Sequence, residues 1–497
     1  MTEIPKYIIN IVNKLETAGF EAFVVGGCVR DIILGKEPRD WDITTNARPE
    51  EMLRVMPEGK YENIFGTVLV PIKNSEGGTE DVVEVTTYRS EQGYSDRRHP
   101  DTIRFEDKLD KDLERRDFTV NAMALRLAEA RSGQALRLGA AGSPQAQEII
   151  DLFGGQKDIK KKTIRAVGEP IDRFKEDALR MIRALRFACE LDFEIEPKTM
   201  RAIAKLAGSI KFVSGERIRD ELIKILSSDR PSDGIELLRE TKMLQYILPE
   251  LERGIGVAQN KHHIYTVYKH SVLSLKFCPS SDWRVRLAAL LHDIAKPQTK
   301  RFIGGDATFY NHDAIGARVT EKIMKRLKFS GADIEKVTLL VRYHMFYYNV
   351  DEVTPAAVRR LLAKVGPENI KDLLDLRIGE RLGSGVPKGK PYKLRHLEYM
   401  LKKVQTDPVS VKMLAINGND LMDKLKLEPG PKIGAILDVL LSEVIEEPAH
   451  NKKDHLMERS KDLCGLDLAV LRQKAKVQIE ERKMEDDQEL KKEFWVK

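Results

Sequence analysis

Two glycines and two aspartates near the amino terminus have the types and spacing needed to bind a nucleotide and a metal ion. Residues 24–31 read VVGGCVRD, and Asp40-Trp41-Asp42 follows them. We expect a buried strand to end at Val25 and a helix to begin near Val29. The backbone N–H groups of Gly26 and Gly27 would then face an incoming triphosphate.

Asp40 and Asp42 are predicted to be alternate residues of a short strand, so both carboxylates would project from one face. Such a pair suits Mg²⁺, which prefers oxygen ligands and keeps water and substrate phosphates in its other positions. Each motif alone is usually a plain turn or a solvated loop. Their order, strand, turn, helix and strand, favours a nucleotide site.

A third acidic residue, Glu84, lies in one of two further predicted strands, at residues 66–72 and 81–88, which are separated by a polar turn at 74–79. On an alternating strand it could simply face solvent. The alternative, which we favour, is that Glu84 completes the metal site or positions the attacking hydroxyl.

The elements that must position these residues form an α+β protein. The chain has 497 residues, of which 42% are hydrophobic, 33% charged and 6% aromatic, which indicates several helix-rich domains. Strand signals end early, and from about Arg173 nearly every segment has helical period. We therefore predict a small mixed α/β head followed by a long all-α body. The segment from Ile4 to Leu15 is predicted to be an amphipathic first helix and not a signal peptide.

Charge and cysteine content limit the partners and the compartment. The net charge of +6 is consistent with an RNA partner. The four cysteines are scattered without the spacing of a zinc site or a disulfide framework, which favours a reducing compartment, and we expect a cytoplasmic protein. No segment approaches the length of a membrane span.

A polar cluster, RRDFTVNA at residues 115–122, is predicted to open a helix that continues through Leu125. Arg116 could hold phosphate oxygens, and Asp117 or Asn121 could hydrogen-bond ribose hydroxyls. The alternative is a surface ion-pair network.

Taken together, these motifs resemble the class II tRNA nucleotidyltransferase and bacterial poly(A) polymerase family. The resemblance rests on GGxVRD, DxD, EVTTYR and RRDFTxNA in this order, and continues into DLFGG at 151–155 and RFxEDxxRxxRAxRF at 173–187. It covers the first half of the chain and runs on more weakly almost to the end. It implies a small nucleotidyltransferase-type head that transfers nucleotides from CTP and ATP to the 3′ acceptor end of tRNA.

Within the last of these motifs, Asp177 and Arg180 are predicted to share a helix face. A carboxylate beside a guanidinium could hold the Watson–Crick edge of cytosine or adenine and reject guanine and uracil. Glu176 would support the arginine. An ordinary i,i+3 salt bridge is the alternative, but in the family this helix acts as the protein template. Arg183 and Arg186, on the same segment, are further predicted nucleotide contacts.

The resemblance also implies a mechanism. Mg²⁺ held by Asp40 and Asp42 would activate the RNA 3′-hydroxyl and neutralise the departing pyrophosphate. Arg30 and the Gly26-Gly27 backbone would hold the triphosphate. The segment from Tyr88 to Phe105 resembles the family's flexible loop beside the site.

A second group of candidate ligands lies downstream, where six of the ten histidines fall between His262 and His344. The HDIAK segment at 292–296 resembles the HD-type metal-dependent phosphohydrolase domain. That resemblance implies Mg²⁺, Mn²⁺ or Ni²⁺ on His270, His292, Asp293 and Asp375, with His312 and His344 at additional positions. The alternative is a degenerate helical platform for RNA.

We therefore predict four segments: a nucleotidyltransferase head at 1–155, a helical neck at 156–262, an HD domain at 263–380, and a linker with a tRNA-binding helical tail at 381–497. The leading function is CCA addition to tRNA with an accessory HD activity, without a membrane or an obligatory protein partner. The alternatives are a poly(A) polymerase, an enzyme that adds only CC or only A, and an HD phosphohydrolase whose head only binds RNA.

Overall fold

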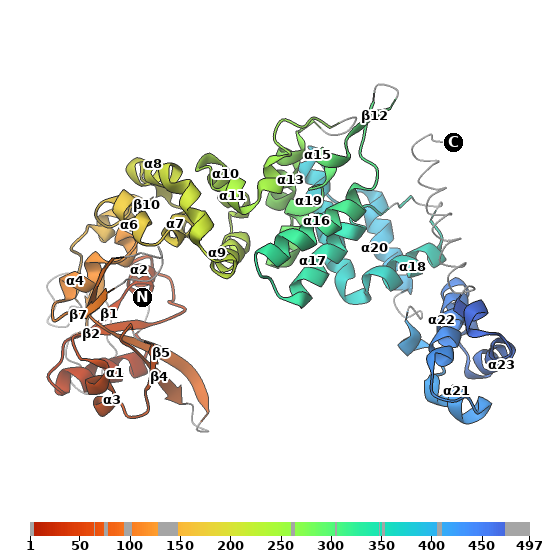
Figure 1. Cartoon of the computed structure of the whole chain (residues 1–497), viewed down its shortest axis with the longest axis horizontal. Coiled ribbons are helices and arrows are strands. Elements are labelled where there is room, and N and C mark those ends of the chain that lie inside the picture. The colour runs from red at the N-terminus through yellow and green to blue at the C-terminus, as the bar shows by residue number, and fades with distance from the viewer. Residues whose placement is uncertain are drawn as a thin grey trace.

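The computed structural model confirms an α+β fold with a sheet-containing head and a mostly helical body (Figure 1). It describes residues 4–63, 65–73, 78–93, 102–127, 148–259, 264–303, 306–346, 348–349, 353–404 and 410–472. Parts of the predicted turn at 74–79 and of the predicted loop at 88–105 lie outside these residues. None of the helices in these ranges has the length and apolar character required to span a bilayer.

The head is built on a seven-stranded sheet in the order β3-β4-β5-β2-β1-β8-β9. Strands β2 and β5 pair in parallel, and the other neighbours are antiparallel. The strands are β1 (Ala22–Val25), β2 (Asp42–Thr45), β3 (Lys60–Asn63), β4 (Thr67–Lys73), β5 (Thr79–Thr87), β8 (Ala124–Arg126) and β9 (Glu148–Ile150). The shorter β6 (Arg89–Gln92) and β7 (Thr102–Phe105) form a separate hairpin.

Every residue of β1 is buried, because both faces of the sheet are covered at this strand. On one face the expected first helix, α1 (Lys6–Thr17), buries Ile8, Val12 and Leu15 in the main core. On the other face a small cluster gathers Phe23 and Val25 with Tyr88. This rigid central strand leads directly into α2 (Gly27–Ile33), which begins at the glycine pair.

The predicted helix through residues 115–125 is wrong. The helix α4 (Leu109–Glu114) ends before this segment, a short 3₁₀ turn η1 covers Thr119–Asn121, and the chain then enters β8. Leu125 pairs with Val24 of β1, so the ladder hydrogen bonds of the sheet prevail over the local helical pattern.

The body begins with eight helices and a short parallel pair of strands, β10 (Thr163–Ile164) and β11 (Glu194–Ile195). The helices are α5 (Gly155–Lys160), α6 (Pro170–Glu176), α7 (Leu179–Leu191), α8 (Pro197–Leu206), α9 (Gly215–Ser227), α10 (Pro231–Glu240), α11 (Leu244–Ile247) and α12 (Pro249–Glu252).

Two further groups of helices follow toward the carboxyl end (Figure 1). The first comprises α13 (Val267–Phe277), α14 (Trp283–Leu291), α15 (Lys296–Thr299), the hairpin β12 (Arg301–Ile303) and β13 (Asp306–Thr308), α16 (His312–Arg326), α17 (Gly331–Tyr343), α18 (Pro355–Val365), α19 (Ile370–Gly383) and α20 (Tyr392–Val404). The last group, α21 (Gly418–Leu425), α22 (Pro431–Glu446) and α23 (Lys453–Cys464), has its own apolar core. The predicted boundary at 380/381 falls inside α19. The domain boundaries stay predictions.

Gly155, the first residue of α5, holds the 3₁₀ turn in place by close contact. A methyl group at this position would lie 2.3 Å from the Thr119 carbonyl oxygen and 2.8 Å from the Met123 sulfur. Gly331 occupies the same helical position in α17 and has open space around it. We expect Gly155→Ala to lower the free energy of unfolding by about 1 to 3 kcal/mol, while Gly331→Ala leaves it nearly unchanged. Chemical denaturation measures both, and equal stabilities would contradict the contact.

Candidate active sites

The glycine turn brings three predicted site residues together. Gly26 has φ of +88°, a conformation that favours glycine, and its amide donates to the Met123 carbonyl oxygen. A Cβ atom at Gly26 would lie 3.0 Å from Arg116 Nη1 and 3.4 Å from Asp42 Oδ2. The backbone at Gly26 is therefore in near contact with both a cation and an acid, as a phosphate and metal site requires.

Asp42 and Glu84 are direct neighbours across the parallel pair β2 and β5. Their side chains leave the same face of the sheet because register partners share an orientation. Asp40 lies just before β2 and is exposed, so the prediction that it belongs to the strand is wrong. It is nevertheless close enough to act electrostatically on both other carboxylates.

These carboxylates repel one another. Burial and Asp40 raise the pKa of Asp42, although Arg116 opposes the shift. Glu84 remains accessible to solvent, yet partial desolvation and the charge of Asp42 raise its pKa. A divalent cation would relieve this repulsion. In the described part of the chain, the ligand atoms of Asp40, Asp42 and Glu84 do not all lie within 4.8 Å of one another. This does not exclude Mg²⁺, because that ion keeps several water ligands and needs only one or two protein carboxylates.

Asp112 is a site residue that the sequence analysis missed. It is fully buried, lies 2.7 Å from Arg115 Nη2 and 3.3 Å from Arg116 Nη2, and is 3.4 Å from the Thr44 hydroxyl of β2. Burial alone would raise its pKa, but Arg115 and Arg116 outweigh burial and lower it. Asp112 therefore fixes Arg116 beside Gly26. Its spacing of three and four residues before the arginines was the available signal.

Asp117 and Asn121, predicted to contact ribose, lie in a network that joins the head to α7. Asp117 Oδ2 is 2.7 Å from Arg183 Nη2, and its Oδ1 accepts from Asn121 Nδ2 at 3.3 Å. Asn121 Oδ1 in turn accepts from Arg30 Nη1 at 2.6 Å. Burial would raise the pKa of Asp117, but Arg183 outweighs burial and lowers it to about 2.

Three predicted nucleotide-binding arginines surround the buried ring of Phe187 on α7. The guanidinium carbons of Arg30, Arg183 and Arg186 lie 5.4, 5.4 and 4.1 Å from the ring centroid. Arg186 is also 2.9 Å from Glu221 on α9, a buried partner that the sequence did not indicate. The ring of Phe187 holds the three guanidinium groups close together. Each of them also pairs with a carboxylate, Arg30 with Asp31, Arg183 with Asp117 and Arg186 with Glu221.

The predicted template pair is arranged differently from expectation. Asp177 and Arg180 do not share a helix: α6 ends at Glu176, Asp177 has extended backbone, and α7 begins at Leu179. Asp177 accepts two hydrogen bonds from Arg217 of α9, at 2.6 and 3.2 Å.

Arg180 contacts Glu176, as expected, and donates to the Arg115 carbonyl oxygen at 3.1 Å. The arginine that pairs with Asp177 is therefore Arg217, which is 40 residues further along the chain. The spacing of residues within the motif could not predict this pair.

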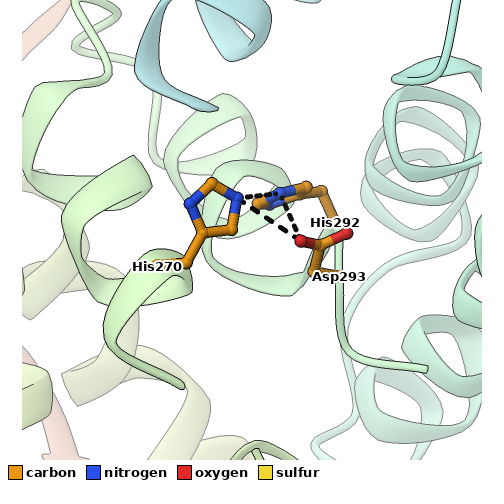
Figure 2. Close-up of side chains that lie close together, drawn as sticks. All are labelled: His270, His292 and Asp293. Carbon is orange, nitrogen blue, oxygen red and sulfur yellow. Dashed lines mark hydrogen bonds and ion pairs between the residues drawn. The ribbon is translucent and has the colours of Figure 1, made fainter. Parts of the chain in front are cut away.

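A second cluster lies among the helices of the body, where His270 of α13 meets His292 and Asp293 at the end of α14 (Figure 2). His270 Nε2 is 3.1 Å from His292 Nε2, and Asp293 Oδ2 lies 3.4 and 3.2 Å from the two rings. On its other side, Asp293 Oδ1 is 3.4 Å from His312 Nε2 and 3.8 Å from His344 Nε2. Asp293 therefore belongs to two buried triads of ligand atoms.

The histidine orientations are fixed from behind. The Nδ1 atoms of His292, His312 and His344 lie 2.8, 2.7 and 2.7 Å from backbone carbonyl oxygens of Ala289, Phe309 and Val341. Because a carbonyl can only accept, Nδ1 donates and the Nε2 lone pair of a neutral ring faces Asp293.

The Nε2 atoms of His312 and His344 are buried without a hydrogen-bond partner. The Nε2 lone pairs of His312 and His344 face the Asp293 carboxylate, which also carries negative charge. These groups repel one another unless a cation or a proton lies between them. The donor set of imidazole and carboxylate fits a divalent metal ion.

Protonation is unfavourable for most of these rings. Burial lowers the pKa of His270 and His344 to about 3 and also lowers the pKa of His312. For His292 burial acts in the same direction, but Asp293 outweighs it and raises the pKa. Neutral imidazole is the form that coordinates metals.

The structure does not bring Asp375 into this cluster. Asp375 pairs with Lys371 at 2.9 Å on the same helix, α19, and lies in neither triad. Glu380, a turn and a half further on, is half-buried. Desolvation would raise its pKa, but Arg377, His292 and His344 outweigh this and lower it. Because 3.6 residues make one turn, these two acids face different sides of α19. Glu380 was missed because the HD resemblance directed attention to an aspartate.

Comparisons with known proteins agree with the head geometry. Residues 22–165 match the poly A polymerase head domain, residues 192–255 match a probable RNA and SrmB-binding site of polymerase A, and residues 312–459 match a putative tRNA nucleotidyltransferase domain 2. Between the last two lie residues 256–311, which include His270, His292 and Asp293 and which none of these three models covers.

Whole-chain relatives extend this similarity. The chain is 32% identical to the A-adding tRNA nucleotidyltransferase of Deinococcus radiodurans, over 84% of this chain and 90% of that protein. It is 31% identical to the CCA-adding enzyme of Enterococcus faecalis, over 93% and 97%. The structure of the Bacillus stearothermophilus CCA-adding enzyme in complex with CTP matches with a TM-score of 0.64 and 27% identity, over 92% and 97% of the two chains.

The ion pair of the buried Asp117 with the half-buried Arg183 should contribute to stability as well as to the site. Removing the cation in Arg183→Met leaves the Asp117 carboxylate without its partner, which we expect to cost about 2 to 3 kcal/mol. Arg126, also in the head, makes a looser and exposed ion pair with Glu148 at 3.7 Å, so Arg126→Met should cost less than about 1 kcal/mol. Urea denaturation of both variants tests the difference, and equal losses would show that the pair with the buried Asp117 contributes no more than the exposed pair.

Proposed function

We propose, because this chain belongs to the tRNA nucleotidyltransferase family, that it builds the 3′-terminal CCA of tRNA from CTP and ATP. The observation that carries the proposal is the placement of Asp42 and Glu84 on adjoining parallel strands, beside the glycine turn and Arg116. That arrangement supplies acids for a metal ion and cations for a triphosphate in one place. We also propose that the protein works in the cytoplasm.

In this reaction the RNA 3′-hydroxyl attacks the α-phosphorus of the bound nucleotide, and the bond to pyrophosphate breaks. Asp40 and Asp42 would hold Mg²⁺, which supplies charge neutralisation for the triphosphate and the hydroxyl. Glu84 would accept a hydrogen bond from the hydroxyl and align it. Arg30, Arg116 and the amides of Gly26 and Gly27 would hold the phosphate oxygens.

Nucleotide choice would depend on the segment between α6 and α7. Asp177 presents a carboxylate that Arg217 fixes from behind, and Arg180 presents a guanidinium that Glu176 and the Arg115 carbonyl oxygen fix. Cytosine and adenine both offer an amine next to a ring acceptor, which this pair would match. Because both partners are already oriented, a guanine or uracil base would leave buried polar groups unpaired.

Addition of A alone is the alternative within the family. One relative is named an A-adding enzyme and another a CCA-adding enzyme, at 32% and 31% identity. We favour full CCA addition because the two template residues fit both bases. Product length on defined tRNA ends separates the alternatives.

The decisive assay supplies tRNA lacking one, two or three terminal nucleotides, with CTP and ATP separately and together. We expect CTP alone to extend the shortest tRNA by two residues, ATP alone to extend only the tRNA lacking one, and both to complete CCA. Asp42→Asn should lower the rate of addition at least about a thousandfold, because a ligand of the metal is lost. The matched control Asp81→Asn changes an exposed acid of the neighbouring strand β5 and should retain activity.

If only the tRNA that lacks one nucleotide were extended, and only by A, the protein would be an A-adding enzyme and the proposal of full CCA addition would be wrong. Normal activity of Asp42→Asn would contradict the site.

A second activity is supported by the buried histidine cluster. We infer that the two triads around Asp293 bind divalent metal ions and hydrolyse phosphate esters. The unpartnered Nε2 atoms of His312 and His344, and the backbone contacts that fix both rings, support the inference. Divalent ions in such a cluster supply Lewis-acid activation for phosphoester hydrolysis. The buried Lys296, 2.7 Å from Asp293, adds a positive charge to the cluster.

Metal binding by the histidine cluster can be measured directly, without an assay of phosphoester hydrolysis. After removal of metals and equilibration with Mn²⁺, Ni²⁺ or Mg²⁺, we expect elemental analysis to show binding by the parent and by Asp375→Asn. His292→Ala and Glu380→Gln should bind more weakly, by tenfold or more. CCA addition should persist in all three variants. Unchanged metal content in His292→Ala would refute the cluster as a site, while a stronger effect of Asp375→Asn than of Glu380→Gln would restore the acid first predicted.

A further inference from the structure

Helix α20 carries a line of aromatic side chains on its outer face. Tyr392, His396 and Tyr399 follow one another at intervals of four and three residues, so they share a face. The centroid of the His396 ring lies 5.9 Å from each tyrosine ring. The two tyrosines are 63% and 59% exposed. We refer to these three residues as the α20 stripe.

Burial does not explain the stripe. The opposite face of α20 packs into the core through Leu394, Leu397, Met400 and Leu401, which are all buried. Tyr348 supports His396 from the side, with its hydroxyl on Nδ1. The tyrosines are therefore held in line by their helix while their ring faces stay open to solvent. Large exposed aromatics in a supported row are typical of binding surfaces.

The surroundings of the stripe are strongly basic. Residues 388–404 contain six lysines and arginines and one glutamate, an excess of positive charge close to that of the whole chain. Along the helix, Lys393, Arg395 and Lys402 are exposed and alternate with the stripe. Interleaved cations and aromatic rings suit single-stranded nucleic acid, in which the cations attract phosphates and the rings stack on bases.

The stripe is far from the nucleotidyltransferase site along the molecule. Figure 1 places α20 on the side of the body away from the head, beyond α16 and α17. An RNA whose 3′ end lies at Asp42 would thus meet the stripe with a different part of its structure. Paired stems hide their base faces, whereas loops expose them.

We propose that the α20 stripe binds tRNA by stacking on unpaired loop bases that are remote from the 3′ end. The proposal rests on the proposed function, which makes tRNA the substrate. Charge complementarity favours tRNA over a protein partner. The cores of protein–protein interfaces contain little lysine, whereas the α20 stripe is surrounded by lysines, which attract phosphates. Binding here would set how the tRNA lies along the body while its end is extended in the head.

The experiment compares two double variants that differ only in ring character. Tyr392→Leu with Tyr399→Leu keeps apolar bulk and removes the rings, whereas Tyr392→Phe with Tyr399→Phe keeps the rings. Because stacking depends on the ring face, we expect the leucine variant to bind tRNA about tenfold or more weakly at fixed salt, and the phenylalanine variant to stay within about twofold of the parent. Phe302→Leu changes an exposed aromatic of β12, 72% exposed, and is the matched control.

Two substrates identify the part of the RNA involved. A hairpin made only of the acceptor stem with its single-stranded end should bind equally to all variants, since it has no remote loop. At saturating tRNA, the rate of nucleotide addition and the KM for CTP should be unchanged. The assay therefore separates this inference from the proposed function, which would fail only if the parent protein adds no nucleotides.

Three results would overturn the inference. One is unchanged tRNA affinity in the leucine variant, and another is an equal loss in Phe302→Leu. The third is a change in sedimentation coefficient of the leucine variant with tRNA affinity intact, which would assign the stripe to contact between copies of this chain. Because both tyrosines are exposed, the melting temperature should stay constant and exclude misfolding as the cause.

Discussion

The parallel pairing of β2 with β5 is the constraint on which the rest of the head depends. It is the one parallel pair in the seven-stranded sheet, and its register sets Asp42 opposite Glu84. Asp42 is half-buried and Glu84 is more exposed. Desolvation raises the pKa of both acids, and the negative charge of Asp40 adds to the rise at Asp42, as the charge of Asp42 does at Glu84. A fold that keeps such a pair stores unfavourable charge where a cation is needed. At the end of the neighbouring strand β1, the glycine turn keeps the protein backbone free of side-chain bulk beside Asp42 and Arg116, where the proposed triphosphate would lie.

Arginine and carboxylate pairs connect this sheet to the body. Asp112 fixes Arg115 and Arg116 from within the head, while Asp117 reaches across to Arg183 of α7 and the Arg115 carbonyl oxygen accepts from Arg180. The groups that would hold phosphates and the groups that would choose the base are thus joined by a few partly buried contacts. Errors in the docking of the head on α7 would disturb both functions together. The histidine cluster shares none of these contacts and is built on α13, α14, α16 and α17.

Sequence patterns predicted what depends on local order and on family motifs. The first helix, the glycine turn, the strand with Glu84 and the helical body follow from periodicity, and the motifs indicated the family that the relatives confirm. Contacts made across long separations were not predictable from one sequence. One example is the pairing of Val24 with Leu125, which places Leu125 in a strand where a helix was expected. Another is the hydrogen bonding of Arg217 to Asp177. Glu380 was overlooked for a related reason, because the turn of α19 decides which acid faces the histidines.

The central claim is that Asp40, Asp42 and Glu84 place a metal ion against a bound triphosphate. The most direct test is the anomalous scattering of Mn²⁺ in crystals of the protein grown with CTP. We expect a peak that is coordinated by Asp42 and by phosphate oxygens, with Gly26 and Arg116 in contact with the triphosphate. A well-ordered CTP elsewhere in the head, or a metal peak away from Asp42, would contradict it.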